Sequence, residues 1–210
     1  MPQYRYDALL VLGAVMKWNF TTEKWEFPAI IESYNGKLVL GKIRAFAASL
    51  LWNIAPTILV TGGSDLNPVT GKRDSRAIQL AKVITDKYCV PKDKVIPVGT
   101  LKGSYTLGNR EDLINFLKTN LKILRKNRIA ILSPRFQMAR AMIMFRLNPY
   151  FDQNDIMLDW FMAEQVICHL YPKFERYERL LYSSSAAEIN RQMEERGIRD
   201  LLSDTYKPVS

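Results

Sequence analysis

Polar and basic residues follow the carboxyl ends of four apolar segments, and their types suit the binding of an anion. They are Gly13; Gly62, Gly63 and Ser64; Gly103, Ser104, Tyr105, Thr106 and Asn109; and Ser133, Arg135, Gln137 and Arg140. Glycine turns and helix N-termini present backbone N–H groups, and arginine holds a phosphate or carboxylate with two N–H groups. These residues therefore indicate a site for a negatively charged group. The alternative is that the glycines only permit tight turns and the arginines are solvated.

The stretch over residues 57–65, TILVTGGSD, shows the pattern most clearly. Its continuous aliphatic and β-branched run is typical of a strand buried on both faces of a parallel sheet. The two glycines that follow permit positive φ and allow a ligand to approach the main chain closely. In open α/β sheets, ligands bind at the carboxyl ends of strands. The stretch predicts a binding cleft but no particular reaction.

The elements that must position these residues alternate between strand and helix. We predict strands at residues 7–13, 57–61, 94–98, 128–132 and, weakly, 157–160, and helices at 37–52, 76–88, 106–124, 137–147 and 186–202. Pro97 indicates either an edge position or the end of its strand. Such alternation implies right-handed crossovers and helices on both faces of a parallel sheet. The predicted fold class is therefore α/β, a Rossmann-like parallel sheet flanked by helices, with a C-terminal helical extension.

The composition of the chain changes near residue 162. We predict an α/β domain over residues 1–161 and a helical extension over 162–210, packed on or beside it. The sequence SAAE at residues 185–188 is a capping box that starts the last helix. The apolar face of that helix either packs on the domain or mediates dimerisation; it comprises Ile189, Met193, Ile198 and Leu201.

Two connections are expected to lack regular structure. Residues 14–37 form a long arm containing Trp18 and Trp25, and residues 64–73 form a polar loop before a helix capped by Asp74 or Ser75. A connection as long as the arm is often functional. The alternative, which we favour, is that the arm is a lid packed by its own aromatic side chains.

Charge and motifs restrict the functional classes. Lys and Arg outnumber Asp and Glu by 30 to 21, a net charge of +9, which favours an anionic ligand, nucleic acid or an anionic membrane surface. The basic residues form no dense run, so general solubility is the competing explanation. The phosphate-loop, Gly-x-Gly-x-x-Gly and Gly-x-Ser-x-Gly motifs are absent, and no cluster has metal-ligand spacing.

The two cysteines and the hydropathy pattern bear on location. Cys89 and Cys168 lie beside apolar residues, so we expect buried free thiols. We see no signal peptide and no apolar run of the roughly 20 residues that cross a bilayer. We therefore expect a cytoplasmic protein without a transmembrane segment. The oligomeric state is left open by the sequence.

Five motifs in order resemble the DUF218 family, also called YdcF-like or SanA/ElyC-like. They are VLG at residues 11–13, Arg44, ILVTGG at 58–63, SYTLGN at 104–109 and SPRFQMARA at 133–141. The resemblance covers roughly residues 7–147. It implies a Rossmann-like α/β fold, a nucleotide-like ligand such as S-adenosylmethionine and an envelope-related role. It also implies that Arg44 belongs to the ligand-binding residues.

Three departures from the family pattern remove titratable groups. Arg76 stands where the family usually has a Glu, Gly108 replaces the Glu of Thr-x-Glu-Asn, and Gln137 replaces a His. Glu and His are usual general acids and bases, whereas Gly and Gln cannot transfer a proton. The lone His169 lies in the extension and is interpreted as structural. These changes favour a more cationic pocket and argue against catalysis.

The residues therefore predict binding of an anionic small molecule at the carboxyl edge of the sheet. Phosphate- or nucleotide-containing compounds, including S-adenosylmethionine, are the expected ligand class, and no catalytic residue is assigned. The alternative is a scaffold that has lost catalysis and binds nucleic acid or another protein. No nucleic-acid recognition motif supports that alternative.

Overall fold

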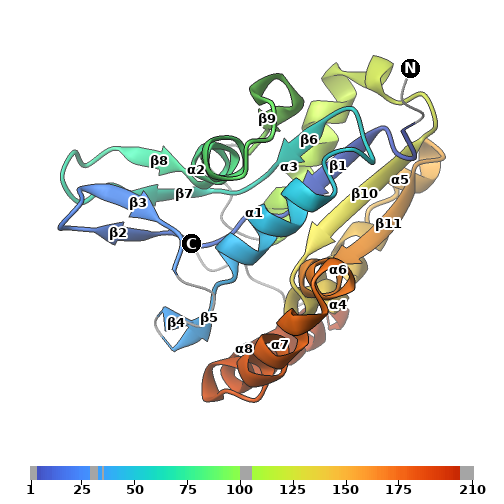
Figure 1. Ribbon diagram of the computed structural model, residues 1–210. Helices are drawn as coiled ribbons and strands as arrows, with labels where there is room; N and C mark the ends of the chain where they lie inside the picture. Colours follow the sequence, from blue (N-terminus) through green and yellow to red (C-terminus); the bar gives the residue numbers. More distant parts are fainter. Residues whose placement is uncertain (1–3, 29–32, 35, 100–105, 204–210) are drawn as a thin grey trace.

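A five-stranded, all-parallel sheet forms the centre of the molecule in the computed structural model, which describes residues 4–28, 33–34, 36–99 and 106–203 (Figure 1). The strand order is β11-β10-β1-β6-β9. The strands are β1 (Ala8–Val11), β6 (Ile58–Val60), β9 (Val95–Pro97), β10 (Arg128–Ser133) and β11 (Met157–Met162). The predicted α/β fold is confirmed, and the strand containing Pro97 lies at an edge of the sheet and ends at Pro97.

Helices cover both faces of the sheet (Figure 1). They are α1 (Gly41–Leu50), α2 (Arg76–Lys82, extended by a π-helical turn, Val83–Lys87), α3 (Thr106–Thr119), α4 (Arg135–Arg146), α5 (Tyr150–Gln153), α6 (Ala163–Leu170), α7 (Glu175–Tyr182) and α8 (Ser185–Leu202). Short 3-10 turns lie at Lys92–Lys94, Leu121–Ile123 and Pro172–Phe174.

The two apolar cores follow from the alternation of side chains along β1. Leu9 and Val11 share one core with α1, α2 and α6, and Ala8 and Leu10 share the other with α3, α4 and α5. All four residues of β1 are buried, since each face of a central strand carries helices. This burial on both faces explains why the sequence of β1 is a continuous apolar run.

Two predicted irregular connections instead contain antiparallel hairpins. The arm contains β2 (Lys17–Asn19) paired with β3 (Lys24–Glu26), and β4 (Ser33–Tyr34) paired with β5 (Lys37–Leu38). The Trp18 and Trp25 rings meet edge to face at 5.2 Å, as expected for an arm packed by its own aromatics. The predicted polar loop at 64–73 contains β7 (Ser64–Leu66), which pairs with β8 (Arg73–Ser75).

The β2–β3 and β7–β8 hairpins lie side by side and project from the sheet (Figure 1). Trp25 Nε1 donates a hydrogen bond of 2.6 Å to Asp74 Oδ2, joining β3 to β8. The strands were missed in the sequence because each has only three residues, too few to show an alternation. Helix α1 begins at Gly41 rather than 37, because Leu40 is left-handed with φ 51° and residues 37–38 pair in β5.

The start and the buried face of α8 differ from the prediction. Ser184, not Ser185, is the N-cap, and its hydroxyl accepts a 3.2 Å hydrogen bond from the Ala187 N–H. The buried residues of α8 are Ala186, Ala187, Asn190 and Gly197. Of the predicted apolar face, Ile189 and Met193 are exposed, whereas Ile198 and Leu201 are partly buried. The helix thus meets the domain through small and polar residues.

The cysteines also correct an expectation. Cys89 is exposed and Cys168 is half-buried, and both are free thiols. Cys89 has a left-handed φ of 57° where the helical segment after α2 ends, so its side chain points away from the core despite its apolar neighbour. Burial of Cys168 raises the pKa of its thiol to about 12, with the hydrogen bond to Glu178 adding to the effect.

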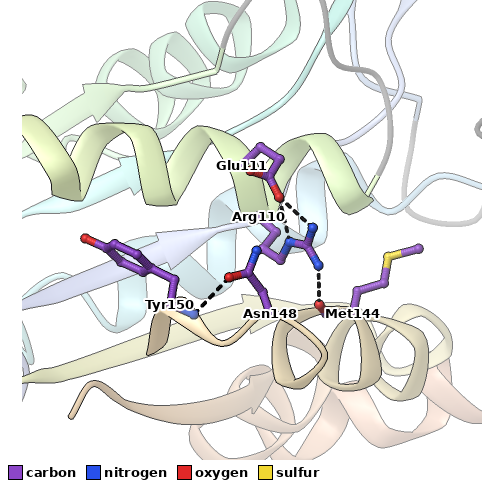
Figure 2. A network of polar contacts seen from close by, with 5 residues as sticks. All are labelled: Arg110, Glu111, Met144, Asn148 and Tyr150. Atoms are coloured by element: carbon purple, nitrogen blue, oxygen red, sulfur yellow. Dashed lines mark hydrogen bonds and ion pairs between the residues drawn. The ribbon is translucent and has the colours of Figure 1, made fainter. Parts of the chain in front are cut away.

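A polar network joins the start of α3 to the end of α4 (Figure 2). Arg110 Nη1 donates a hydrogen bond of 2.7 Å to the Met144 carbonyl, and its Nε and Nη2 bond the Glu111 carboxylate. A cation at a helix C-terminus is favourable, because the last carbonyls of a helix lack intrahelical partners. Beyond α4, Asn148 Oδ1 accepts a hydrogen bond from the Tyr150 N–H and starts α5.

Arg110→Ala should lower the free energy of unfolding by about 1–3 kcal/mol, the usual effect of losing a hydrogen bond to a charged group. The Met144 carbonyl and the Glu111 carboxylate would lose a half-buried partner. Urea unfolding followed by circular dichroism measures the change. The matched control is Arg179→Ala, whose side chain is 80% exposed in a loose 3.8 Å pair and should change stability by less than about 0.5 kcal/mol. Equal losses for the two variants would contradict a special role for Arg110.

Candidate functional site

The glycines at the strand ends contact one another. A Cβ atom on Gly13 would lie 2.5 Å from Gly62 Cα and 2.7 Å from the Thr61 carbonyl oxygen. A Cβ atom on Gly99 would clash with the Gly62 carbonyl oxygen, and Gly62 itself has a φ of 147° that favours glycine. Close packing of three strand-end loops therefore explains these glycines, of which Gly13 and Gly62 were predicted to belong to a ligand site.

Arg44 of α1 is buried at the end of the central strand. Its Nη1 donates hydrogen bonds to the carbonyl oxygens of Leu12 (3.1 Å) and Gly13, and its Nη2 donates to Gln137 Oε1 at 3.0 Å. The guanidinium thus ties β1 to the first turn of α4. Desolvation lowers the pKa of Arg44 to about 10, although the nearby Glu164, among other groups, acts in the opposite direction.

Arg140 of α4 forms a two-pronged ion pair with Glu194 of α8. Its Nε and Nη2 lie 2.7 and 2.9 Å from the two carboxylate oxygens, and the side chains are only 18% and 12% exposed. Gly197 makes room for this contact, because a Cβ atom there would lie 3.1 Å from Arg140 Cδ. The arginine predicted to bind an anionic ligand therefore holds a carboxylate of the chain itself.

Glu164 is the second buried carboxylate of this region. It follows β11 and is fully buried (0% exposed), with Oε2 accepting a 3.0 Å hydrogen bond from the Arg135 N–H at the start of α4. Its Oε1 accepts a hydrogen bond from the Tyr182 hydroxyl. Burial raises the pKa of Glu164, and this effect outweighs the hydrogen bonds and the charge of Arg44, which act to lower it. Burial and the same carboxylate raise the pKa of Tyr182.

We call these six residues the polar cluster: Arg44, Gln137, Arg140, Glu164, Tyr182 and Glu194. The cluster lies at the carboxyl ends of β1 and β11 and is closed by α8, which packs beside α4 and β5 (Figure 1). It contains two guanidinium and two carboxylate groups, so its formal charges balance. The prediction of a more cationic pocket therefore needs correction, because the extension supplies acidic side chains in place of those lost from the motifs.

The remaining predicted site residues lie around this cluster or apart from it. Arg135 is at its rim, with Nη1 3.8 Å from Glu178 and the guanidinium over the Tyr182 ring. Ser133 ends β10 with a buried hydroxyl that has no hydrogen-bond partner among the described residues. Asn109 is buried in the first turns of α3.

The double-glycine turn leads into a separate group on the β7–β8 hairpin. Ser64 Oγ lies 3.3 Å from Arg73 Nη1, and the Gly63 carbonyl accepts a hydrogen bond of 2.8 Å from the Arg76 N–H. Arg76 also pairs with Asp65 through two nitrogens. The arginine that replaces the family's Glu is thus neutralised within its own hairpin.

Part of the predicted site cannot be placed. Gly103, Ser104 and Tyr105 lie outside the described residues, and only the backbone of Thr106, the first residue of α3, is described. Within the described ranges, no group of three or more His, Cys, Asp or Glu side chains has metal-site geometry. Over the same ranges, no helix has the length and apolar character needed to span a bilayer.

Two acidic residues of the cluster were missed from the sequence. Glu164 directly follows β11, so the rule that ligand residues follow strand ends would have found it had the fifth strand been given the same weight as the others. Glu194 lies on an amphipathic helix among other charged residues, and its partner is 54 residues away. Nothing local in the sequence distinguishes it.

Loss of Arg140 alone should be costly. Arg140→Met leaves Glu194 as a buried carboxylate without its partner, and removal of one member of a buried pair typically costs about 3–5 kcal/mol. The double variant Arg140→Met/Glu194→Met removes both charges and should recover most of that loss. Urea unfolding of the two variants and of Glu194→Met completes a double-mutant cycle. Additive losses would contradict the interaction.

Glu164→Gln should make stability less dependent on pH. Because the folded pKa of Glu164 is raised, its contribution to stability is full below the ordinary value of 4.5 and is lost as the pH rises through the folded pKa. The stability advantage of the wild type over Glu164→Gln should therefore shrink above pH 4.5. The change is about 1.4 kcal/mol per pH unit over which only the folded state keeps the proton. Glu175→Gln, at an exposed position, serves as the control for losing a surface charge; a gap that widens with pH would contradict the assignment.

No protein-family model, curated protein or solved structure matches the chain. The resemblance to the DUF218 family therefore stays a prediction from the motifs. The geometry of the polar cluster and of the strand ends around it therefore provides the structural basis for a proposed function.

Proposed function

We propose that this protein binds a small anionic molecule at the carboxyl edge of its parallel sheet. Phosphate- or nucleotide-containing compounds are the proposed ligand class, together with the nucleotide-like S-adenosylmethionine, whose anionic group is a carboxylate. The observation that carries the proposal is a pair of buried donors at the ends of adjacent strands. Arg44 Nε beside β1 and Ser133 Oγ at the end of β10 have no hydrogen-bond partner among the described residues.

Unsatisfied buried donors are costly, which is why they are rare in folded proteins. An anion at this edge would accept from both donors and would lie near the cationic cluster residue Arg140. The start of α4 lies at the same edge, and a helix N-terminus adds favourable potential for negative charge. Arg135, in the first turn of α4, has a 59% exposed side chain and is suited to meet a ligand at the rim.

The proposal contains no reaction. Gln137 stands where the DUF218 family usually has a His. Its side-chain oxygen accepts a hydrogen bond from Arg44, so it orients a guanidinium and cannot transfer a proton. Glu164 is fully buried and is occupied as a hydrogen-bond acceptor at the start of α4. An envelope-related role belongs to the proposal only through the family resemblance, and the cytoplasmic location expected from the sequence stays part of the proposal.

Isothermal titration calorimetry with inorganic phosphate, ADP and S-adenosylmethionine tests the proposal. The wild type should bind at least one of them saturably. Arg135→Ala should weaken binding about 3- to 30-fold, as expected for loss of one exposed charge-assisted contact. The Arg140→Met/Glu194→Met variant removes the buried fork without leaving an unpaired charge and should weaken it further.

The matched control is Arg179→Ala on α7, which removes an arginine that is 80% exposed away from the cluster. It should leave the dissociation constants unchanged at constant ionic strength. Absence of saturable binding in every titration would reject the proposal, as would equal effects of Arg135→Ala and Arg179→Ala. Binding to duplex DNA with a steep salt dependence, without small-molecule binding, would favour the nucleic-acid alternative instead.

A further inference from the structure

We propose that α8 is an internal, displaceable ligand, with the Glu194 carboxylate occupying the place of the anionic group of the bound molecule. This inference rests on the proposed function and adds its regulation. In the closed form Glu194 holds Arg140, and an incoming carboxylate or phosphate monoester takes Glu194's position on Arg140. Binding and release of α8 become two sides of one equilibrium.

The geometry of the ion pair is that of a ligand contact. Two guanidinium nitrogens lie 2.7 and 2.9 Å from two carboxylate oxygens; the Nη2–Oε1 contact is a hydrogen bond, whereas the close Nε–Oε2 contact lacks hydrogen-bond geometry. The same two nitrogens are the pair with which arginine binds carboxylate or phosphate. The pair connects α4, which starts at the sheet edge, to a segment from the C-terminal extension. An external anion of the same shape fits the same fork once Glu194 withdraws.

The glycine in α8 supports this assignment. Glycine in a helix interior costs about 1 kcal/mol relative to alanine, yet Gly197 is buried directly against Arg140. With a side chain at that position, Arg140 Cδ would have to shift. The helix thus gives up intrinsic stability at the one place where it crosses the arginine.

Polar contacts, which water can replace, hold the second turn of α8. Asn190 Oδ1 accepts from the Leu38 N–H (3.2 Å) and its Nδ2 donates to the Leu38 carbonyl (2.9 Å). Ile189 and Met193 are 39% and 47% exposed, and further along the helix Ile198 and Leu201 are only partly buried, so the apolar area that opposes detachment is modest. Ala186 and Ala187, in the first turn of α8, belong to the apolar core. Detachment is therefore a swing of the C-terminal part about this anchored turn.

The electrostatics allow exchange. A buried ion pair contributes little net stability, because desolvation of the two charges offsets their attraction. Burial raises the pKa of Glu194 even against Arg140 and Arg44, so the carboxylate is not held in its most favourable environment. Withdrawal of Glu194 also leaves two arginines facing Glu164 alone, a net positive site that attracts an anion.

The test measures the affinity of three full-length variants for inorganic phosphate and for succinate, which separate the phosphate and carboxylate sources of the anion. Glu194→Gln removes the competing charge and should tighten binding by about 5- to 150-fold, the usual range of coupling between two binding events. Asn190→Ala keeps the ion pair, loosens α8 from Leu38, and should tighten binding in the same direction. The control Glu195→Gln changes the adjacent carboxylate, which is 63% exposed, and should leave affinity unchanged.

Hydrogen exchange provides the structural readout on wild-type protein. At saturating phosphate or succinate, amides of residues 190–202 should exchange faster, while amides of β1 and β10 should not. Circular dichroism establishes that each variant is folded. Asn190→Ala keeps the proposal testable should Glu194→Gln not fold.

The possible results separate the two proposals. If the wild type and all variants fail to bind either probe and the nucleotides, the proposed function itself is rejected. If the wild type binds and Glu194→Gln and Asn190→Ala bind equally well, with unchanged exchange in α8, displacement is overturned and the binding function stands. If Glu194→Gln alone gains affinity and α8 exchange is unchanged, the effect is local charge and displacement is again overturned. Gains in both variants with faster α8 exchange support it.

Discussion

A buried guanidinium needs acceptors and compensating charge, and the arrangement around Arg44 follows from this demand. Arg44 donates hydrogen bonds to carbonyl oxygens at the end of β1 and to the side-chain oxygen of Gln137 on α4. Glu164 and Glu194 supply negative charge within electrostatic reach. One side chain thus connects the central strand, α1, α4 and the extension, and its burial explains why acidic groups gather at this edge.

The C-terminal extension supplies side chains to the carboxyl edge of the sheet. Glu164 caps α4 from the end of β11, and Glu194 reaches Arg140 from α8. The strand-end glycines pack against each other, which brings the loops together and leaves side chains, rather than bare backbone, to form the site. The side chains at this edge are therefore brought together by contacts between segments that are separate in the sequence, and the proposed binding depends on those contacts.

Most of the central fold is predictable from local patterns. The apolar runs that became β1, β6 and β10 are buried on both faces, so their composition directly reflects their position. The hairpin strands were not predicted, because three-residue strands show no periodicity and are held by contacts such as that of Trp25 with Asp74. The face of α8 was misjudged because helix spacing favoured Ile189 and Met193, whereas the docking surface needed small and polar residues.

Local patterns in the sequence predict the α/β class, the order of the five sheet strands and the helices between them, and the gathering of Ser133, Arg135 and Arg140 after a strand end. These depend on the hydrophobicity and propensity of neighbouring residues, which any short window contains. The close packing of Gly13, Gly62 and Gly99 against one another, and the ion pair between Arg140 and a carboxylate from α8, are visible only in the tertiary structure. Such pairings are set by the packing of distant segments, because the free energy of a buried charge depends on what surrounds it in space.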